Sequence, residues 1–461
     1  YLELAQGADE ATSIELRRKA AEQLITNGYI DEGRVLLIEV LRRVDLKLPG
    51  SYRSAVFGHY MHRACLRWNG LVFTDTDEAQ IAPADLHRID ACWLTALSMS
   101  FVDPVLGMYF HERNLLYSLK AGEQYRVLRA FTMELAFMVQ MGDYDWNVWS
   151  KLLTRCKALA NHVNLAHGHA LVFMAEGMSA YLEGRYKNAY RLLRQAERTI
   201  VELCPGVTFE LAQCRLFALR SLMYVGELKQ VGLEHPKLVN EATECGNLLL
   251  SSSLRSDIFV LLLLAKDAPD KARSNLASAR AQWSRAGAHF QHFFEIRGQV
   301  YLALYEDRNE DAWAEITRAW DTLTSALLDR GITTRVSMHD ARGTAALGRG
   351  KAGIRDAAAS ASALLAAKGQ RMAEPCGHMI IGGIAMLQGA TKDADEGYER
   401  AMDGFAKVEM QLHAAVARRR LGGVRGGREG ALLIQAADGW FANQDVVDVE
   451  KLCQAIAPIP R

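Results

Sequence analysis

The 461-residue sequence lacks several features that define common classes of protein. Its longest purely apolar run, IFVLLLLA at Ile258–Ala265, is far shorter than the roughly 20 residues that cross a bilayer, so we interpret it as a buried helix. The eight cysteines are scattered without a CxxC pair, which favours reduced thiols and a cytoplasmic location. Basic and acidic residues balance at 54 each, so the basic excess typical of nucleic-acid binders is missing.

The usual signatures of catalysis are also missing. The sequence contains no HExxH, no GxSxG and no kinase catalytic loop. LGRGKAG at Leu347–Gly353 places Lys351 after a glycine, but Ala352 stands where a phosphate-binding loop needs serine or threonine for magnesium. We therefore predict no catalytic residues and no cofactor-binding residues, and we expect this chain not to be an enzyme.

Two histidine motifs have a spacing that metal sites use. GHYMHRAC places His59, His62 and Cys65 three residues apart, on one face of a helix, where they could hold zinc. No fourth ligand is evident, so we interpret the histidines as packing or surface residues and predict no metal site. HFQHFF at His289–Phe294 repeats the spacing among aromatic residues, which is typical of a core.

Arginine is concentrated at one place. ARRRLGGVRGGREG at Ala417–Gly430 contains five arginines among glycines. One interpretation is a patch for anions or RNA. The other is a helix C-terminus, where cations suit the helix dipole, followed by glycine turns. We favour the second and expect no nucleic-acid partner.

Strand signals are nearly absent and only nine residues are proline, whereas apolar residues recur at the three- and four-residue spacing of amphipathic helices. In AYLEGRYKNAYRLLRQAERTI, Gly184 separates two such runs and is followed by Ala189, Leu193 and Ala196 at fixed offsets. The same small–large–small offsets follow Asp267, Asp307 and Gly389, giving Ala272–Leu276–Ala279, Ala312–Ile316–Ala319 and Ala394–Tyr398–Ala401.

These positions belong to a regular series. Its anchors are Gly184, Gly226, Asp267, Asp307, Gly348 and Gly389, which are separated by steps of 42, 41, 40, 41 and 41 residues. We predict a turn between helices at each anchor, with Ala189, Ala272, Ala312 and Ala394 buried between paired helices.

A helix pair of this kind cannot bury its apolar face alone, so the pairs stack into an array in which each contacts its neighbours. The offsets resemble the tetratricopeptide repeat, although its usual period is about 34 residues; HEAT or armadillo units are the alternative. We predict an all-α, right-handed α-solenoid of tetratricopeptide-like helix pairs with a period of about 41 residues.

The array divides into three parts. Residues 1–50 hold a first helix pair, and because the chain begins at Tyr1 rather than methionine we expect this part to join an upstream region. Residues 51–122 form an atypical helical segment, with an acidic loop near 71–88 between helices near Tyr52–Asn69 and Ala84–Ser100. Residues 123–461 form the repeat array with C-terminal capping helices.

Several stretches go beyond a generic repeat. They are IDACWLTALSMSFVDPVLG (Ile89–Gly107), LKAGEQYRVLRAF (Leu119–Phe131), AYLEGRY (Ala180–Tyr186), WSRAGAHFQHFF (Trp283–Phe294), ELRRKAAEQLITNGYIDEG (Glu15–Gly33), and MQLHAAVARRRLGGVRGGREG with NQDVVDVEKLCQAIAP. Together they resemble the C-terminal tail of large bacterial serine/threonine protein kinases that carry a signal-transduction ATPase module. The chain departs from that family at Asp445 and Val446, where a glycine-containing turn is usual, and at its closing Pro458–Ile459–Pro460.

The resemblance implies a non-catalytic sensor or protein-interaction tail that regulates an upstream ATPase and kinase in the same parent chain. Its expected partners are those domains and a protein or peptide ligand, without a membrane. The alternatives are an independent scaffold or adaptor and the helical sensor domain of a transcription regulator.

Overall fold

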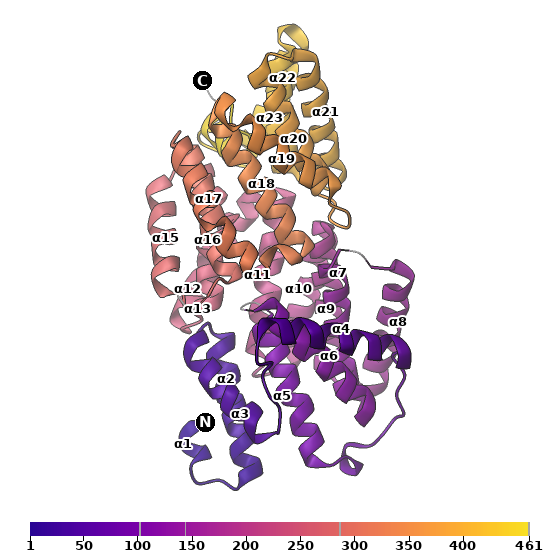
Figure 1. The fold of residues 1–461 in the computed structure, drawn as a ribbon. Coiled ribbons are helices and arrows are strands. Elements are labelled where there is room, and N and C mark those ends of the chain that lie inside the picture. Colours follow the sequence, from indigo (N-terminus) through magenta and orange to yellow (C-terminus); the bar gives the residue numbers. More distant parts are fainter. Residues whose placement is uncertain (101–102, 143, 285–286, 460–461) are drawn as a thin grey trace.

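The computed structural model describes residues 1–100, 103–142, 144–284 and 287–459, and within them the only extended secondary structure is helical. Twenty-four α-helices and three short 3-10 helices follow one another through these residues (Figure 1). The prediction of an all-α, solenoid-like repeat fold is confirmed; the hand of the solenoid stays a prediction.

The helices before the middle of the chain are α1 (Leu2–Ala5), α2 (Glu10–Thr26), α3 (Ile30–Arg43), α4 (Tyr52–Asn69), α5 (Pro83–Met99), α6 (Pro104–Ala121), α7 (Gln124–Gln140), α8 (Trp146–Val163), α9 (Ala166–Glu183), α10 (Tyr186–Leu203), α11 (Thr208–Val225) and α12 (Leu228–Glu244). The later helices are α13 (Leu248–Leu254), α14 (Phe259–Ala265), α15 (Pro269–Gln282), α16 (Phe290–Tyr305), α17 (Asn309–Ser325), α18 (Ile332–Gly348), α19 (Ile354–Ala366), α20 (Ala373–Gln388), α21 (Thr391–Lys407), α22 (Gln411–Arg425), α23 (Gly427–Asn443) and α24 (Val449–Ile456). The 3-10 helices are η1 (Glu78–Gln80), η2 (Leu328–Arg330) and η3 (Gly350–Gly353).

All six predicted anchors lie at the end of a helix. α9, α11 and α20 each end one residue before an anchor glycine that adopts a left-handed conformation, a common way to stop a helix. α14 and α16 end two residues before Asp267 and Asp307, which have φ of 49° and 58°. α18 ends at Gly348 itself.

The small residues after the anchors lie at close helix contacts, as predicted. Ala189, Ala272, Ala312 and Ala394 are all fully buried. On the facing helix of the first pair, a Cβ on Gly177 would lie only 2.9 Å from the Leu193 side chain. The two backbones therefore approach closely because one side offers no side chain and the other fills the groove with leucine.

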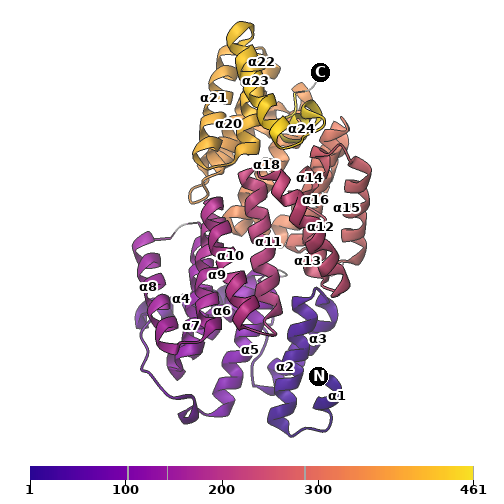
Figure 2. The ribbon, with the colours of Figure 1, turned by 180° about the vertical axis from the view of Figure 1, so that it is seen from behind.

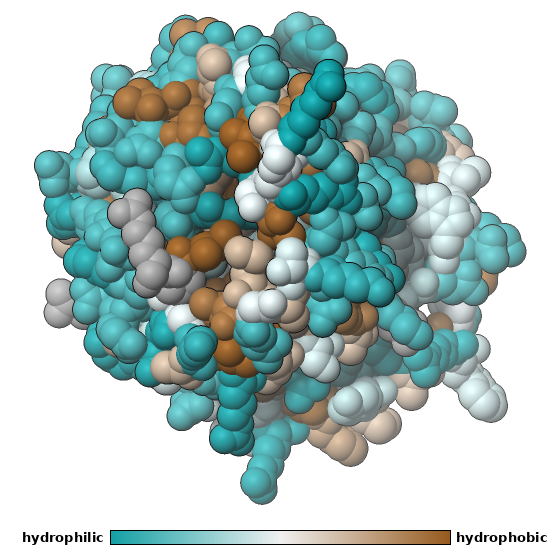
Figure 3. Space-filling view, turned by 90° about the horizontal axis from the view of Figure 1, so that it is seen from above, coloured by the Kyte–Doolittle hydropathy of each residue, from teal (hydrophilic) through white to brown (hydrophobic). Residues whose placement is uncertain are grey.

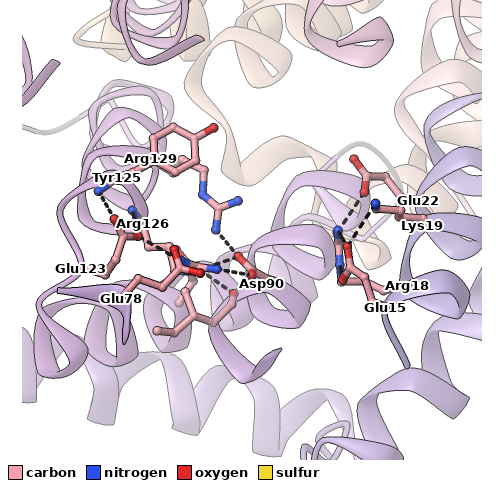
Figure 4. A network of polar contacts seen from close by, with 12 residues as sticks. Glu15, Arg18, Lys19, Glu22, Glu78, Asp90, Glu123, Tyr125, Arg126 and Arg129 are labelled. Atoms are coloured by element: carbon pink, nitrogen blue, oxygen red, sulfur yellow. Dashed lines mark hydrogen bonds and ion pairs between the residues drawn. The ribbon is translucent and has the colours of Figure 1, made fainter. Parts of the chain in front are cut away.

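The predicted helices on either side of the acidic loop are α4 and α5, with η1 in the loop between them. Asp90 on α5 forms ion pairs with Arg126 and Arg129 on α7, and Arg126 also pairs with Glu78 of η1 and with Glu123 (Figure 4). These contacts fasten the atypical segment to the first helix of the repeat array.

Helix pairs contact more than their neighbours in the sequence, because segments that lie far apart in the sequence also touch. The carbonyl oxygen of Leu182, at the end of α9, accepts a hydrogen bond from Gln370, which lies 188 residues later. The backbone N–H of Lys229 bonds to Gln444, 215 residues later. With a period of about 41 residues, these separations correspond to roughly five repeats for one turn of a superhelix whose successive turns contact each other.

The contacts between turns have a common physical cause. The last carbonyl groups of a helix have no partner within that helix and need one elsewhere. Asn27 after α2, Glu183 at the end of α9 and Ala265 at the end of α14 all offer such carbonyls, which accept from the N–H groups of Leu248, Arg371 and Val447. In Figures 1 and 2, α18–α23 accordingly lie beyond one end of α7–α11 rather than extending away from them.

Among the described residues, no single helix is long and apolar enough to cross a membrane. α13 and α14 satisfy the length and composition criteria only as a pair that is bent by 43°.

Overpacking one repeat provides a test of the close contacts. Ala312→Leu is expected to lower the free energy of unfolding by about 1–3 kcal/mol, because leucine does not fit the contact between α16 and α17. Since α16 also packs against α24, faster hydrogen exchange should reach α24 as well as α17, while α2 and α3 keep their protection. Unchanged exchange in both α16 and α17 would show that this contact tolerates a larger side chain.

Candidate functional site

The first helix of most pairs lines the inside of the superhelix, and the second helix lies outside. α11 illustrates an inner helix, since 14 of its 18 residues are buried. The inner faces of α5, α7, α9, α11, α13, α16 and α18 surround a cavity of about 250 Å³. This volume is just below the range of about 300–1,000 Å³ that small-molecule sites span.

Most of the cavity wall is apolar. α7 and α9 supply three methionines, whose flexible side chains adapt to ligands of different shape. The remaining apolar wall is mainly aromatic and aliphatic, and includes Trp93, Phe137, Leu171, Tyr181, Phe209, Phe217, Phe290, Phe293 and Phe294.

α11 runs along the cavity and places polar groups at separate points of its wall. Glu210, Gln213, Phe217, Arg220 and Tyr224 recur at the three- and four-residue spacing of one helix face, and all of them line the cavity. With a rise of about 1.5 Å per residue, Glu210 and Arg220 lie roughly 15 Å apart along the helix axis. The cavity is therefore apolar in its middle, with a titratable group towards each end of this face.

A buried charge cluster forms one end of the cavity. Asp257, in the turn between α13 and α14, is fully buried and pairs with two arginines. Its carboxylate oxygens lie 2.8 Å from Nη1 of Arg220 and 3.1 Å from Nη1 of Arg297. Arg297 also donates hydrogen bonds to the hydroxyl groups of Tyr224 and Tyr301, at 3.2 and 3.0 Å.

Two guanidinium groups meet at one carboxylate, that of Asp257. A further carboxyl group, Asp340, acts on Arg297 through its charge, and burial raises the pKa of Asp340. Nε and Nη2 of Arg220, and Nη2 of Arg297, are buried and make no well-aligned hydrogen bond, although the hydroxyl of Tyr181 interacts with the Arg220 guanidinium group. Buried polar groups are normally paired, so these donors mark a place where a further acceptor fits.

Towards the other end of the cavity, the same face of α11 carries a carboxyl group with a shifted pKa. Burial raises the pKa of Glu210 to about 7, so a protonated, neutral carboxyl group is much easier to form here than at the surface. His167 lies 3.7 Å from Glu210 and bonds to the hydroxyl of Tyr125, while burial and the charge of Arg129 lower the pKa of His167 to about 4. The surroundings therefore disfavour the charged forms of both groups.

The three residues with zinc-like spacing lie on α4, where the two histidines reach one carboxylate and the cysteine does not join them. Nδ1 of His59 lies 2.7 Å from Oε1 of Glu112, Nδ1 of His62 lies 3.7 Å from Oε2 of the same carboxylate, and Cys65 is exposed. No group of three or more metal-ligating side chains converges in the part of the chain that the structure describes.

The polar side chains of α4 instead fasten this helix to α6 and α7. Arg63 bridges Glu112 and Glu134 at 2.6 and 2.5 Å, and His111 also contacts Glu134. Although burial raises the pKa of Glu134, hydrogen bonding to His111 and the charge of Arg63 outweigh it and bring the pKa to about 2. The histidine motif thus serves packing between helices.

The other motifs have structural roles as well. His289 precedes α16 and forms a capping box with His292, so the second histidine pair starts a helix. In the arginine-rich segment, Arg425 ends α22 and pairs with Asp395, Glu399 and Glu429, which agrees with the helix-terminus interpretation. Lys351 lies in η3, a short connection between α18 and α19.

Arg419 and Arg420 of the same segment, which the helix-terminus interpretation does not explain, pair with Glu450 of α24. At the departures from the family pattern, Asp445 adopts φ of 53°, a left-handed turn that aspartate tolerates, and Val446 follows it. Pro460 lies outside the described residues.

A second hollow, of about 400 Å³, lies among α15, α16 and α17. Its charged residues already pair with one another, since Arg280 contacts both Glu295 and Glu315. The cavity beside α11 is the stronger candidate because its buried donors are not all paired.

The outer surface carries one prominent aromatic feature, on α4. Phe57, Tyr60 and Trp68 are 68, 68 and 91% exposed, and Met61 is half exposed. We call these four residues the α4 aromatic face. On the face seen in Figure 3, hydrophilic residues predominate, and apolar side chains are gathered near the middle and at the upper left of the view.

Arg220 and Arg297 escaped the sequence analysis, although the sequence holds a signal for them. Each is a single arginine within an apolar helical run, LFALRSLMYV and FFEIRGQVYLALY. A lone arginine in a helix that is apolar all round must be buried and needs a partner.

No protein-family model matches this chain, and no curated protein matches it significantly.

Proposed function

We propose that this chain is a non-catalytic sensor and protein-interaction tail that controls an upstream ATPase and serine/threonine kinase of the same bacterial parent protein. The observation that carries the proposal is the cavity inside the superhelix. Its wall includes α9 and α18, which belong to different turns and are joined where Thr333 donates to the carbonyl oxygen of Leu182. A ligand in the cavity would therefore contact both turns and change how they pack against each other.

The kinase and ATPase part of the proposal rests on the resemblance of the quoted stretches. It places the chain in the cytoplasm, with a protein or peptide partner and no role for nucleic acid or a membrane. An independent adaptor is the second candidate, because exposed apolar patches mark protein contacts and the α4 aromatic face is such a patch. The sensor domain of a transcription regulator is a third.

Two variants of the full-length parent protein separate the sensor from the adaptor. Ala136→Leu adds a larger side chain to the cavity wall, whereas Trp68→Ser removes the most exposed member of the α4 aromatic face. For a sensor, Ala136→Leu is expected to change autophosphorylation by about fivefold or more, which corresponds to a coupling free energy of about 1 kcal/mol, at the lower end of the usual range of about 1–3 kcal/mol. Labelled ATP measures this output, and circular dichroism confirms that both variants are folded.

The opposite pattern would favour the adaptor: altered output or partner binding in Trp68→Ser and none in Ala136→Leu. A parent gene without ATPase and kinase segments upstream of Tyr1 would contradict the regulatory proposal directly.

A further inference from the structure

Resting on the proposed function, we propose that the cavity beside α11 binds a small amphiphilic carboxylate, with its apolar body against α7 and α9 and its carboxylate on Arg220. The apolar wall of the cavity supports the apolar body of this ligand, and the incompletely paired donors of Arg220 support its carboxylate.

The head group is identified by the geometry of Arg220. Nη1 of this residue faces Asp257, whereas Nε and Nη2 make no well-aligned hydrogen bond. These two nitrogens form the side-on edge of the guanidinium group, whose two parallel N–H bonds match the two oxygens of a carboxylate. A neutral hydroxyl group would satisfy only one of these donors.

The charges of the residues around Arg220 also favour an anionic head group. Among the described residues, Asp257 is the carboxylate that pairs with Arg220, and Arg297 shares it. Asp340 is a further carboxyl group whose charge acts on Arg297, and burial raises its pKa. An anionic head group would give Arg220 a second negative partner, whereas a cationic head group would meet its guanidinium group.

The apolar part of the ligand follows from the rest of the wall. Met133, Met174 and Met178 line the cavity together with several aromatic rings, and the cavity volume of about 250 Å³ limits the ligand to a small molecule. An acyl chain of about eight carbons or an aryl group is the class of body that such a wall accepts.

Entry of the head group requires a small movement. The unpaired nitrogens of Arg220 are enclosed by protein atoms, and the ring of Phe294 lies 4.1 Å from the guanidinium carbon. Phe294 also lines the cavity, so rotation of its side chain would open Arg220 to a ligand. Side-chain rotations of this kind are common on binding.

Isothermal titration calorimetry with n-octanoate, octan-1-ol and octylammonium tests the proposal, since the three probes share a chain length and differ in charge. Octanoate is expected to bind saturably at one site, octanol at least about tenfold more weakly because it lacks the charged hydrogen bonds, and octylammonium not at all.

Two variants locate the site. Arg220→Lys keeps a positive partner for Asp257 but loses the side-on edge, so octanoate should bind about tenfold more weakly while octanol is unchanged. Ala136→Leu adds a larger side chain to the apolar wall of the cavity and should weaken the binding of octanoate and octanol alike.

Equal binding of octanoate and octanol, or unchanged octanoate binding in Arg220→Lys, would overturn the assignment of the head group. No saturable binding of octanoate would overturn the ligand class. If Ala136→Leu still altered kinase output in either case, the sensor function would stand without this ligand. If octanoate bound as expected and Ala136→Leu left the output unchanged, the site would stand and the regulatory role would fail.

Discussion

Asp257→Asn is expected to lower the free energy of unfolding by about 3–5 kcal/mol, the usual loss when one member of a buried ion cluster is removed. Asparagine has nearly the same shape and tolerates the left-handed backbone at this position, where φ is 59°. The substitution therefore removes the charge and little else. Arg220 and Arg297, which are 3 and 2% exposed, would then both lose their ion pair with this residue while remaining buried.

Chemical denaturation followed by circular dichroism measures the loss, and Asp270→Asn is the matched control. Asp270 also pairs with an arginine, but its side chain is 94% exposed, so water replaces the lost contact and no measurable change is expected. A midpoint for Asp257→Asn equal to that of Asp270→Asn would show that the cluster does not depend on its carboxylate. If octanoate binds as proposed, it should restore part of the lost stability by supplying a carboxylate.

Local features of the fold could be predicted because each has a local cause. The turn after α9 follows from a glycine between two amphipathic runs, and the burial of Ala189 follows from the need for a small residue between close helices. The 41-residue spacing then extended the prediction to anchors with little side-chain similarity, such as Gly226 and Gly348.

The contacts between turns of the superhelix could not be predicted in this way. They join a helix end, Leu182, to an irregular loop at Gln370, and neither segment has a periodic pattern that names its partner. Backbone carbonyl groups are identical in every residue, so the sequence does not show which of them will find a distant donor.

The candidate site was missed for the same reason. Arg220 and Arg297 lie in different repeats, and only the folded chain brings them to Asp257. The sequence alone shows two arginines in apolar helices and an aspartate in a turn. Their joint arrangement, two buried guanidinium groups around one carboxylate at the end of a cavity, depends on tertiary packing.

The docking of the turns and the shape of the cavity are linked through shared residues. Thr333 and Leu182 both line the cavity and also join α18 to the end of α9. Gln370 donates to the same carbonyl oxygen of Leu182. A substitution that separates the loop at Gln370 from α9 should therefore also shift residues of the cavity wall, although the loop itself does not line the cavity.

Gly369→Ala tests this link and is expected to lower the free energy of unfolding by about 2–5 kcal/mol. Gly369 has φ of 89°, where a side chain is strained by about 1–2 kcal/mol. A Cβ would also lie 2.3 Å from the carbonyl oxygen of Gly142, so the loop must move away, and such overpacking costs about 1–3 kcal/mol more. The neighbouring hydrogen bonds of Gln370 and Arg371 to α9 move with it.

Gly206→Ala is the matched control, because Gly206 has nearly the same backbone, with φ of 87°, and open space around its Cβ position. It should show only the backbone strain. Hydrogen exchange should quicken at the N–H of Arg371, which bonds to Glu183, in Gly369→Ala but not in Gly206→Ala. Since Leu182 also lines the cavity, octanoate affinity should fall only in the first variant. The two substitutions could instead destabilise the protein equally and leave Arg371 protected. That result would show that the loop adjusts without breaking its hydrogen bonds to α9. It would contradict a link between the docking of the turns and the cavity through this loop.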